Sequence, residues 1–309
     1  MNIALKGIMP ALITPVDRDG TLREEAARAL VEWLLGQGVH GFYVCGNTGE
    51  GPALSEETRR RMLEATLEQT AGRGTVICHV GAADAQSALR LARHAHEAGC
   101  NAISSLPPTG YYDYSEDEIF DYYRALGESA PLPLIVYANG MFRQADIAPF
   151  IGRLATLPTV CGVKFTRMNC YELRNLVELG IAVVNGPDES LVNGLAMGAC
   201  AGIGSTYNLM AERFVQLYNL FTAGEFEAAR QVQFEINRII RVIIKHGVIR
   251  GTKQALCVLG FDAGEPAWPG KAFTPEESRL FRAEMASAGF RFSGPPNPPE
   301  SPRTFSRPA

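Results

Sequence analysis

The stretch Thr159-Val160-Cys161-Gly162-Val163-Lys164-Phe165-Thr166 is an apolar, partly β-branched run that carries one lysine near its C-terminal end. Successive side chains of a strand point to opposite faces, so Val163 and Phe165 share one face while Lys164 and Thr166 share the other. If the strand is buried on both faces, it directs an amine into the interior. Burial lowers the pKa of a lysine, and an amine that is partly neutral near pH 7 can attack a ketone to form an imine. The same pattern also fits a solvated lysine at a strand end or one half of an ion pair.

Further short apolar runs resemble this one, and each is followed by a turn signal and a segment with helical periodicity. The eight runs begin near Ile8, Gly41, Thr75, Ala102, Leu132, Thr159, Ile181 and Cys200. Helices are predicted at Leu22 to Leu35, after the capping signal Ser55-Glu56-Glu57, at Ala85 to Ala98 and at Glu116 to Leu126. Strands that alternate with helices imply a parallel sheet. Eight such units predict an α/β fold of the (β/α)8 TIM-barrel type, with a doubly wound open sheet as the second choice.

The chain divides into three predicted parts. Residues 1–222 form the barrel, residues 223–290 an appended C-terminal helical cap, and residues 291–309 a disordered tail. The cap consists of helical stretches at Phe226 to Lys245, Thr252 to Leu259 and Pro275 to Ala288. One function that we consider for it is contact between subunits. The prolines of the tail, interleaved with serine and charged residues, cannot continue a helix or pack a core.

Composition limits the partners of the chain. The 309 residues carry a formal net charge of −4 and no run of lysine or arginine, so nucleic acid is not expected as a partner. The seven cysteines are scattered and never spaced C-x-x-C, which indicates reduced thiols in a cytoplasmic protein. The start lacks the pattern of a signal peptide, and no apolar run approaches the roughly 20 residues that span a bilayer. The five histidines are also scattered, so no metal site is expected.

In a barrel, the C-terminal ends of all strands meet at one rim, so the residues that follow each strand become neighbours. After the second run, Gly46-Asn47-Thr48-Gly49-Glu50-Gly51 offers glycines, two polar side chains and backbone N–H groups. This turn suits a small carboxylate, and a purely structural turn is an equal alternative. Tyr137 ends the fifth run, where its phenol is either a proton relay or ordinary packing. His79 ends the third run, where packing is expected.

Polar residues also follow the seventh and eighth runs, in Asn185-Gly186-Pro187-Asp188-Glu189 and in Gly202-Ile203-Gly204-Ser205-Thr206-Tyr207-Asn208. Asp188 can cap the helix that follows it, with Glu189 complementing the first turn, or it can bind a substrate. Ser205 or Thr206 is likewise either a helix cap or a hydroxyl partner.

Taken together and in order, these strand ends resemble those of the dihydrodipicolinate synthase/N-acetylneuraminate lyase family of pyruvate-dependent class I aldolases. The resemblance covers about residues 7–259. It implies that Lys164 forms a Schiff base with pyruvate or another 2-keto acid, and that Tyr137 shuttles the proton during carbon–carbon cleavage. It also implies that Asn47 and Thr48 hold the carboxylate. No cofactor is needed, because the lysine imine is the electron sink. A homotetramer is the assembly typical of the family.

The seventh and eighth strand ends look like those of the N-acetylneuraminate lyase branch. That likeness implies that Gly186, Asp188, Glu189 and Ser205, together with Thr166, bind the hydroxyl groups of a sugar acid. The implied reaction is retro-aldol cleavage of N-acetylneuraminate to pyruvate and N-acetylmannosamine.

Several positions depart from the family pattern, mainly where the acceptor is selected. Dihydrodipicolinate synthases are expected to carry an arginine where this chain has Phe142, although Arg143 follows directly. Asn47 replaces a usual serine or threonine, and Tyr111 falls where the family places a tyrosine that reaches into a neighbouring subunit's site. The alternatives are therefore a dihydrodipicolinate synthase or another 2-keto-3-deoxy sugar acid aldolase or dehydratase. A non-catalytic sensor of 2-keto acids is the alternative from a different class.

Overall fold

The computed structural model describes residues 3–108, 113–140, 142 and 146–292, and within them eight parallel strands form a barrel. The strands are β1 (Gly7–Pro10), β2 (Gly41–Val44), β3 (Thr75–His79), β4 (Ala102–Ser105), β5 (Leu134–Ala138), β6 (Val160–Phe165), β7 (Ala182–Asn185) and β8 (Ala201–Gly204). They pair in the order β1-β8-β7-β6-β5-β4-β3-β2. The circle closes where Ala11, just beyond β1, bridges Tyr43 of β2, and where the Leu12 N–H donates to the Tyr43 carbonyl at 2.9 Å.

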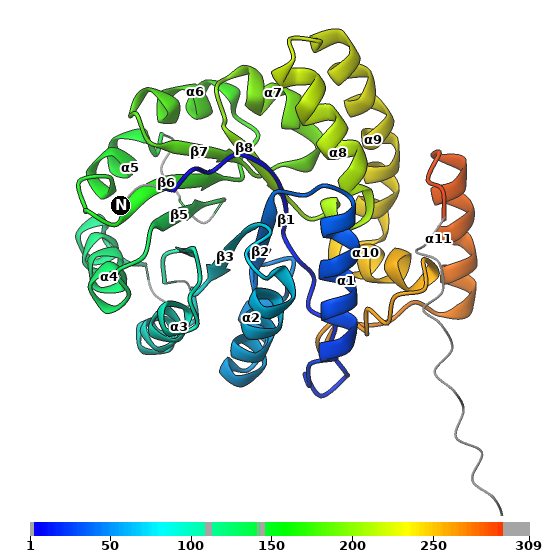
Figure 1. Cartoon of the computed structure of the whole chain (residues 1–309), viewed down its shortest axis with the longest axis horizontal. Helices are drawn as coiled ribbons and strands as arrows, with labels where there is room; N and C mark the ends of the chain where they lie inside the picture. Colours follow the sequence, from blue (N-terminus) through cyan, green and yellow to red (C-terminus); the bar gives the residue numbers. More distant parts are fainter. Residues whose placement is uncertain (1–2, 109–112, 141, 143–145, 293–309) are drawn as a thin grey trace, which may run out of the picture.

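Helices cover the outside of the strands (Figure 1). They are α1 (Glu24–Gly36), α2 (Glu56–Thr70), α3 (Ala85–Glu97), α4 (Glu116–Ser129), α5 (Ala148–Leu154), α6 (Cys170–Glu178), α7 (Leu191–Ala196) and α8 (Tyr207–Thr222), with short 3-10 helices η1 (Gly51–Ala53) and η2 (Asp188–Ser190). The predicted capping signal before α2 is confirmed, because the Ser55 hydroxyl accepts the Thr58 N–H at 3.1 Å. Such a cap stabilises a helix by about 1 kcal/mol. The eight parallel strands and the helices between them confirm the predicted (β/α)8 barrel.

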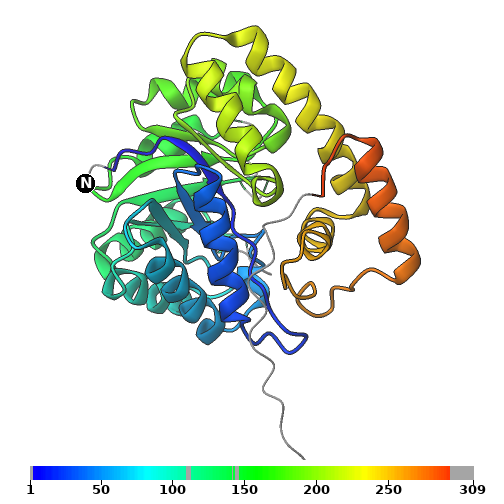
Figure 2. The same cartoon turned by 45° about the vertical axis from the view of Figure 1, so that its right-hand side comes forward.

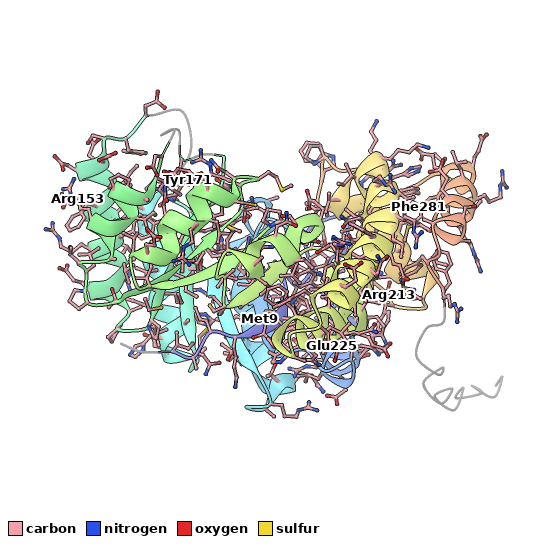
Figure 3. The ribbon with its side chains drawn as sticks, turned by 90° about the horizontal axis from the view of Figure 1, so that it is seen from above. Met9, Arg153, Tyr171, Arg213, Glu225 and Phe281 are labelled. Atoms are coloured by element: carbon pink, nitrogen blue, oxygen red, sulfur yellow. The ribbon has the colours of Figure 1, made fainter. Side chains whose placement is uncertain are left out.

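Strand alternation produces two apolar layers. Val163 and Phe165 of β6 belong to the outer layer, between the strands and the helices. Met9 of β1 and Ile203 of β8 belong to the inner layer, and Figure 3 places Met9 among the strands. Fully burying a side chain of this size stabilises the fold by roughly 1.5–3 kcal/mol. Lys164, between Val163 and Phe165, therefore points into the barrel, as the alternation predicts.

Three further helices follow the barrel: α9 (Phe226–His246), α10 (Val248–Val258) and α11 (Pro275–Ser287). They stand to one side of the strands (Figure 2), and α9 packs along α8 with Ile236, Ile239, Ile240 and Ile243 buried. Phe281 of α11 is fully buried in the group that these helices form (Figure 3). The domain limits at 222 and 290 remain predictions, and the tail from residue 293 lies outside the described residues. None of the described helices has both the length and the apolar character needed to cross a membrane.

Candidate active site

Lys164 lies inside the barrel, 4% exposed, and directly opposite Tyr137 in the pairing of β6 with β5. Its Nζ atom lies 3.9 Å from the centroid of the Tyr137 ring and 5.3 Å from that of Tyr43. The same atom donates to the Thr166 hydroxyl at 3.1 Å. Within the described ranges, no carboxylate forms an ion pair with Lys164. Lys164 is therefore neither a solvated lysine nor, among the described residues, one half of an ion pair.

Aromatic rings surround the amine on the strand side. The Tyr43 and Tyr137 rings meet edge to face at 6.1 Å between centroids, and His79 meets Tyr137 in the same way at 5.8 Å. The Tyr43 hydroxyl donates to Ser104 at 3.0 Å. Burial raises the pKa of Tyr43 well above its usual value, so its phenol stays neutral. The sequence did not single out Tyr43. Alternation along β2 does, however, place its ring on the inner face of the strand, while Phe42 and Val44 lie on the outer face.

His79 is also held neutral. It is 1% exposed, and burial, helped by the charges of Arg59 and Lys164, lowers the pKa of its imidazole to about 3. Its Nε2 atom accepts the Leu106 N–H at 3.3 Å. The predicted packing role thus agrees with its contacts, and these place a neutral ring beside Tyr137.

The predicted carboxylate turn is rigidly held. A Cβ atom on Gly49 would lie 2.7 Å from the Leu12 carbonyl oxygen, so a glycine is required there. The Gly49 carbonyl accepts the Thr14 hydroxyl at 2.6 Å. The Thr48 and Ser205 hydroxyls are 2.7 Å apart, which joins the turn to the end of β8. Asn47 is exposed at the outer part of the turn.

The Asp188 carboxylate is buried and already hydrogen-bonded. Its Oδ1 accepts the Ser205 N–H at 3.1 Å, and its Oδ2 accepts both the N–H and the hydroxyl of Thr206 at 2.6 Å. Burial outweighs these hydrogen bonds and raises the pKa of Asp188 to about 6. Asp188 does not cap η2, the helix that starts with it. Its carboxylate instead supports the turn at the start of α8.

Two other predicted residues border this turn. A Cβ atom on Gly186 would lie 2.0 Å from the Thr166 hydroxyl oxygen, so glycine lets the ends of β6 and β7 approach. Glu189 is half-buried, its carbonyl accepts the Asn237 side chain of α9 at 2.9 Å, and it lines a hollow of about 530 Å³ with Arg238. Unlike Asp188, Glu189 shows no side-chain hydrogen bond to the described part of the protein.

The remaining predicted residues divide into two groups. Tyr111 and Arg143 lie outside the described residues. Phe142 is 4% exposed and packs against Phe150, so an apolar ring occupies the place expected for the arginine of the synthases. No group of three or more histidine, cysteine, aspartate or glutamate residues in the described ranges could hold a metal ion.

A family model, curated sequences and solved structures all show similarity between this chain and the same group of enzymes. The model of the dihydrodipicolinate synthetase family matches residues 4–285. The chain is 39% identical over 285 residues to an N-acetylneuraminate lyase of Rhizobium meliloti, covering 91% of this chain and 95% of the relative. An N-acetylneuraminate lyase of Salmonella typhimurium is 37% identical over 295 residues, covering 93% and 97%. The solved structure of Proteus mirabilis N-acetylneuraminate lyase superposes with a TM-score of 0.88 at 29% identity, covering 94% and 100%.

Proposed function

The chain belongs to the dihydrodipicolinate synthetase family, and from this membership we propose that it cleaves N-acetylneuraminate to pyruvate and N-acetylmannosamine. Its relatives and structural neighbours identify it as a carbon–carbon lyase of the class I aldolase type. One observation carries the proposed chemistry: the Lys164 amine is buried in the barrel 3.9 Å from the Tyr137 ring centroid, with no carboxylate paired to it among the described residues.

The proposed reaction begins when the Lys164 amine attacks the C2 ketone and water leaves, which forms a protonated imine. The imine draws the electrons of the C3–C4 bond as that bond breaks. The C4 hydroxyl loses its proton and becomes the aldehyde carbonyl, and the remaining carbons stay on the lysine as an enamine. A proton then adds to C3, and water hydrolyses the imine to release pyruvate. Tyr137 is the group beside the amine that relays these protons.

We assign substrate binding to groups in the turns that follow β2, β6, β7 and β8. The N–H groups and hydroxyl of the Thr48 turn hold the substrate carboxylate, so that the ketone meets the amine. Thr166, Gly186, Asp188, Glu189 and Ser205 offer acceptors and donors to the sugar hydroxyls, as the family resemblance implies. Glu189 is the clearest candidate, because among the described residues no hydrogen bond engages its carboxylate, whereas the Asp188 carboxylate supports the α8 turn. Asn47 and Tyr111 keep the roles that the resemblance implies.

The imine is tested by reduction with borohydride in the presence of pyruvate. We expect a covalent mass gain on Lys164 that is absent from Lys164→Ala, with a peptide map locating the modified residue. A wild-type protein without this gain would exclude every Schiff-base reaction and leave the 2-keto-acid sensor as the function. Turnover of N-acetylneuraminate, compared with pyruvate plus aspartate semialdehyde, separates the lyase from the synthase. The buried Phe142 supports the lyase.

A homotetramer in the cytoplasm completes the proposal. The family resemblance supports the assembly, and the seven free cysteines support a reducing compartment. Light scattering on the protein as it elutes from a size-exclusion column measures the mass of the assembly directly. A mass other than four chains would contradict the homotetramer.

A further inference from the structure

A buried ion pair joins the turn of the candidate site to the C-terminal helices. Lys253 of α10 is 1% exposed and Glu50 is 8% exposed, and the Lys253 Nζ lies 2.5 Å from the Glu50 Oε2. The other oxygen of the Glu50 carboxylate accepts the Ala267 N–H at 2.7 Å. The Lys253 ammonium also donates to the Glu265 carbonyl at 2.7 Å. Both charges are therefore held by the segment that connects α10 with α11.

The ion pair is linked to the turn that is proposed to bind the substrate carboxylate. Glu50 has a left-handed backbone with a φ of 54°, which is uncommon for a residue other than glycine. Its N–H donates to the Asn47 carbonyl at 3.0 Å, and the Gly51 N–H donates to the Gly46 carbonyl at 3.1 Å. The orientation of the peptide groups from residue 46 to residue 51 is thus linked to the position of Glu50. A shift of Glu50 would change where the Thr48 N–H and hydroxyl point.

The connecting segment is itself anchored to the barrel. Gly264 forms a parallel bridge with Val16, which follows β1, and a Cβ atom on Gly264 would lie 2.2 Å from the Val16 carbonyl oxygen. The segment therefore lies close against the barrel chain before it reaches Glu50. It provides a fixed support from which Lys253 and Ala267 hold the carboxylate.

A stability role alone does not explain two buried charges at this place. Burial lowers the pKa of Lys253, while Glu50 acts in the opposite direction. Replacing a buried ion pair by apolar groups of similar volume is often neutral for stability or even favourable. What an ion pair adds is a defined relative position of its two side chains, because the charges tolerate few alternative arrangements in a buried place.

From these contacts we propose that Lys253 is a positioning residue for the 2-keto acid. It fixes Glu50, and through Glu50 it fixes the turn that binds the substrate carboxylate. The inference rests on the proposed function for the identity of the ligand. It makes the C-terminal helices part of the binding apparatus, although the effect of α10 on the substrate is indirect.

The experiment replaces the pair and measures pyruvate binding separately from reactivity. The double variant Glu50→Gln/Lys253→Met removes both charges and so leaves no unpaired buried charge. Its matched control is Arg250→Met/Glu277→Gln, which removes another ion pair of α10, with an Arg250 to Glu277 distance of 2.7 Å. Arg250 also holds the connecting segment, through the Lys271 and Ala272 carbonyls, but not the turn.

Borohydride reduction at increasing pyruvate concentration gives both the half-saturating concentration and the trapping rate at saturation. For the Glu50/Lys253 variant, we expect the half-saturating concentration to rise about 10-fold or more, because displaced groups hold the ketone poorly against the amine. The trapping rate at saturation should stay within about 2-fold, because Lys164 and its neighbours are unchanged. The control variant should match the wild-type protein in both quantities.

Three results separate the possible failures. If wild-type protein is not trapped at all, the proposed function fails. If it is trapped, and the double variant has the same half-saturating concentration, the positioning role is wrong. An equal rise in the control variant would also overturn it, since a general loosening of the helices would then explain the effect. Melting temperatures check folding, and Glu50→Gln/Lys253→Gln, which also leaves no unpaired buried charge, supplies the same comparison if the first double variant does not fold.

Discussion

The two sides of the barrel mouth are built differently. The lysine side, made of Tyr43, His79, Tyr137 and Lys164, consists of buried rings around one amine, and this amine donates a hydrogen bond to the Thr166 hydroxyl. The other side, which we call the polyol side after its proposed ligand, contains Gly186, Asp188, Glu189 and Ser205, and the Asp188 carboxylate ties its two turns together by accepting the Ser205 and Thr206 N–H groups. Among the described residues, the amine of the lysine side thus has no ionic partner, whereas on the polyol side hydrogen bonds hold the Asp188 carboxylate in place but not that of Glu189.

Under the proposed function, this difference separates the residues that react from the residues that recognise the substrate. An imine needs an amine whose lone pair is free to attack the ketone, and among the described residues no carboxylate is paired with Lys164. Recognition of hydroxyl groups needs acceptors, and the carboxylates proposed for this role are those of Asp188 and Glu189. Variants on the two sides should therefore fail in different ways.

The largest expected effect is on the lysine side, where Lys164→Ala removes the nucleophile. We expect turnover to fall below detection, a loss of at least about 10⁴-fold, because no imine can form. Lys245→Ala is the matched control, since that lysine is exposed and paired with Glu284 far from the rings. Substantial residual turnover in Lys164→Ala, measured by release of pyruvate, would show that the imine is not the route.

Tyr137→Phe should separate capture from cleavage. Pyruvate trapping should survive, while cleavage of the sugar acid slows roughly 10²-fold or more, because the proton relay is lost. Tyr43→Phe is the matched control: it removes another hydroxyl beside the same amine, one that is bonded to Ser104. Its turnover should stay within about 10-fold of wild type. A fully active Tyr137→Phe would mean that its phenol is only a packing group.

Glu189→Gln tests the polyol side with a smaller effect. The half-saturating concentration of the sugar acid should rise about 10-fold, while pyruvate trapping stays unchanged, because pyruvate has no polyol to bind. Glu235→Gln is the control, an exposed glutamate of α9 paired with Arg213. Equal losses for the sugar acid and for pyruvate would favour a purely structural role for Glu189.

The sequence was sufficient for the barrel because local patterns specify it. The eight apolar runs begin within two residues of the observed strands, and Leu132 against the observed Leu134 is the largest difference. The alternation around Lys164 also predicted which face of β6 is interior. Both depend on neighbouring residues, which is why a single sequence contains them.

The partners of the site residues could not be predicted in the same way. Capping of the helix that follows was one of two alternatives for Asp188, yet its hydrogen bonds come from the turn after β8. The Glu50–Lys253 ion pair joins residues far apart in the chain, and neither position carries a local signal. Such contacts depend on how closely separate elements approach, and neither periodicity nor turn composition reports that distance.

The last expected effect concerns stability and its dependence on pH, and residues from the two sides give opposite signs. The pKa of His79 is lowered from 6.5 to about 3, so its contribution to stability is present above pH 6.5 and is lost as the pH falls towards 3. The unfolded chain binds a proton in that interval and the folded chain does not. The pKa of Asp188 is raised from 3.8 to about 6, so its contribution is present below pH 3.8 and is lost as the pH rises through 6.

Substitution of each residue should therefore change the pH dependence in opposite directions. Between about pH 7.5 and about pH 5, the free energy of unfolding of His79→Gln relative to wild type should improve by about 2 kcal/mol. That of Asp188→Asn should worsen by about 1 kcal/mol over the same interval, because the wild-type protein alone gains the proton. Urea unfolding at the two pH values measures both differences. If both stay constant with pH, burial does not control these two groups, and the contrast between a neutral ring and a buried carboxylate would have to be abandoned.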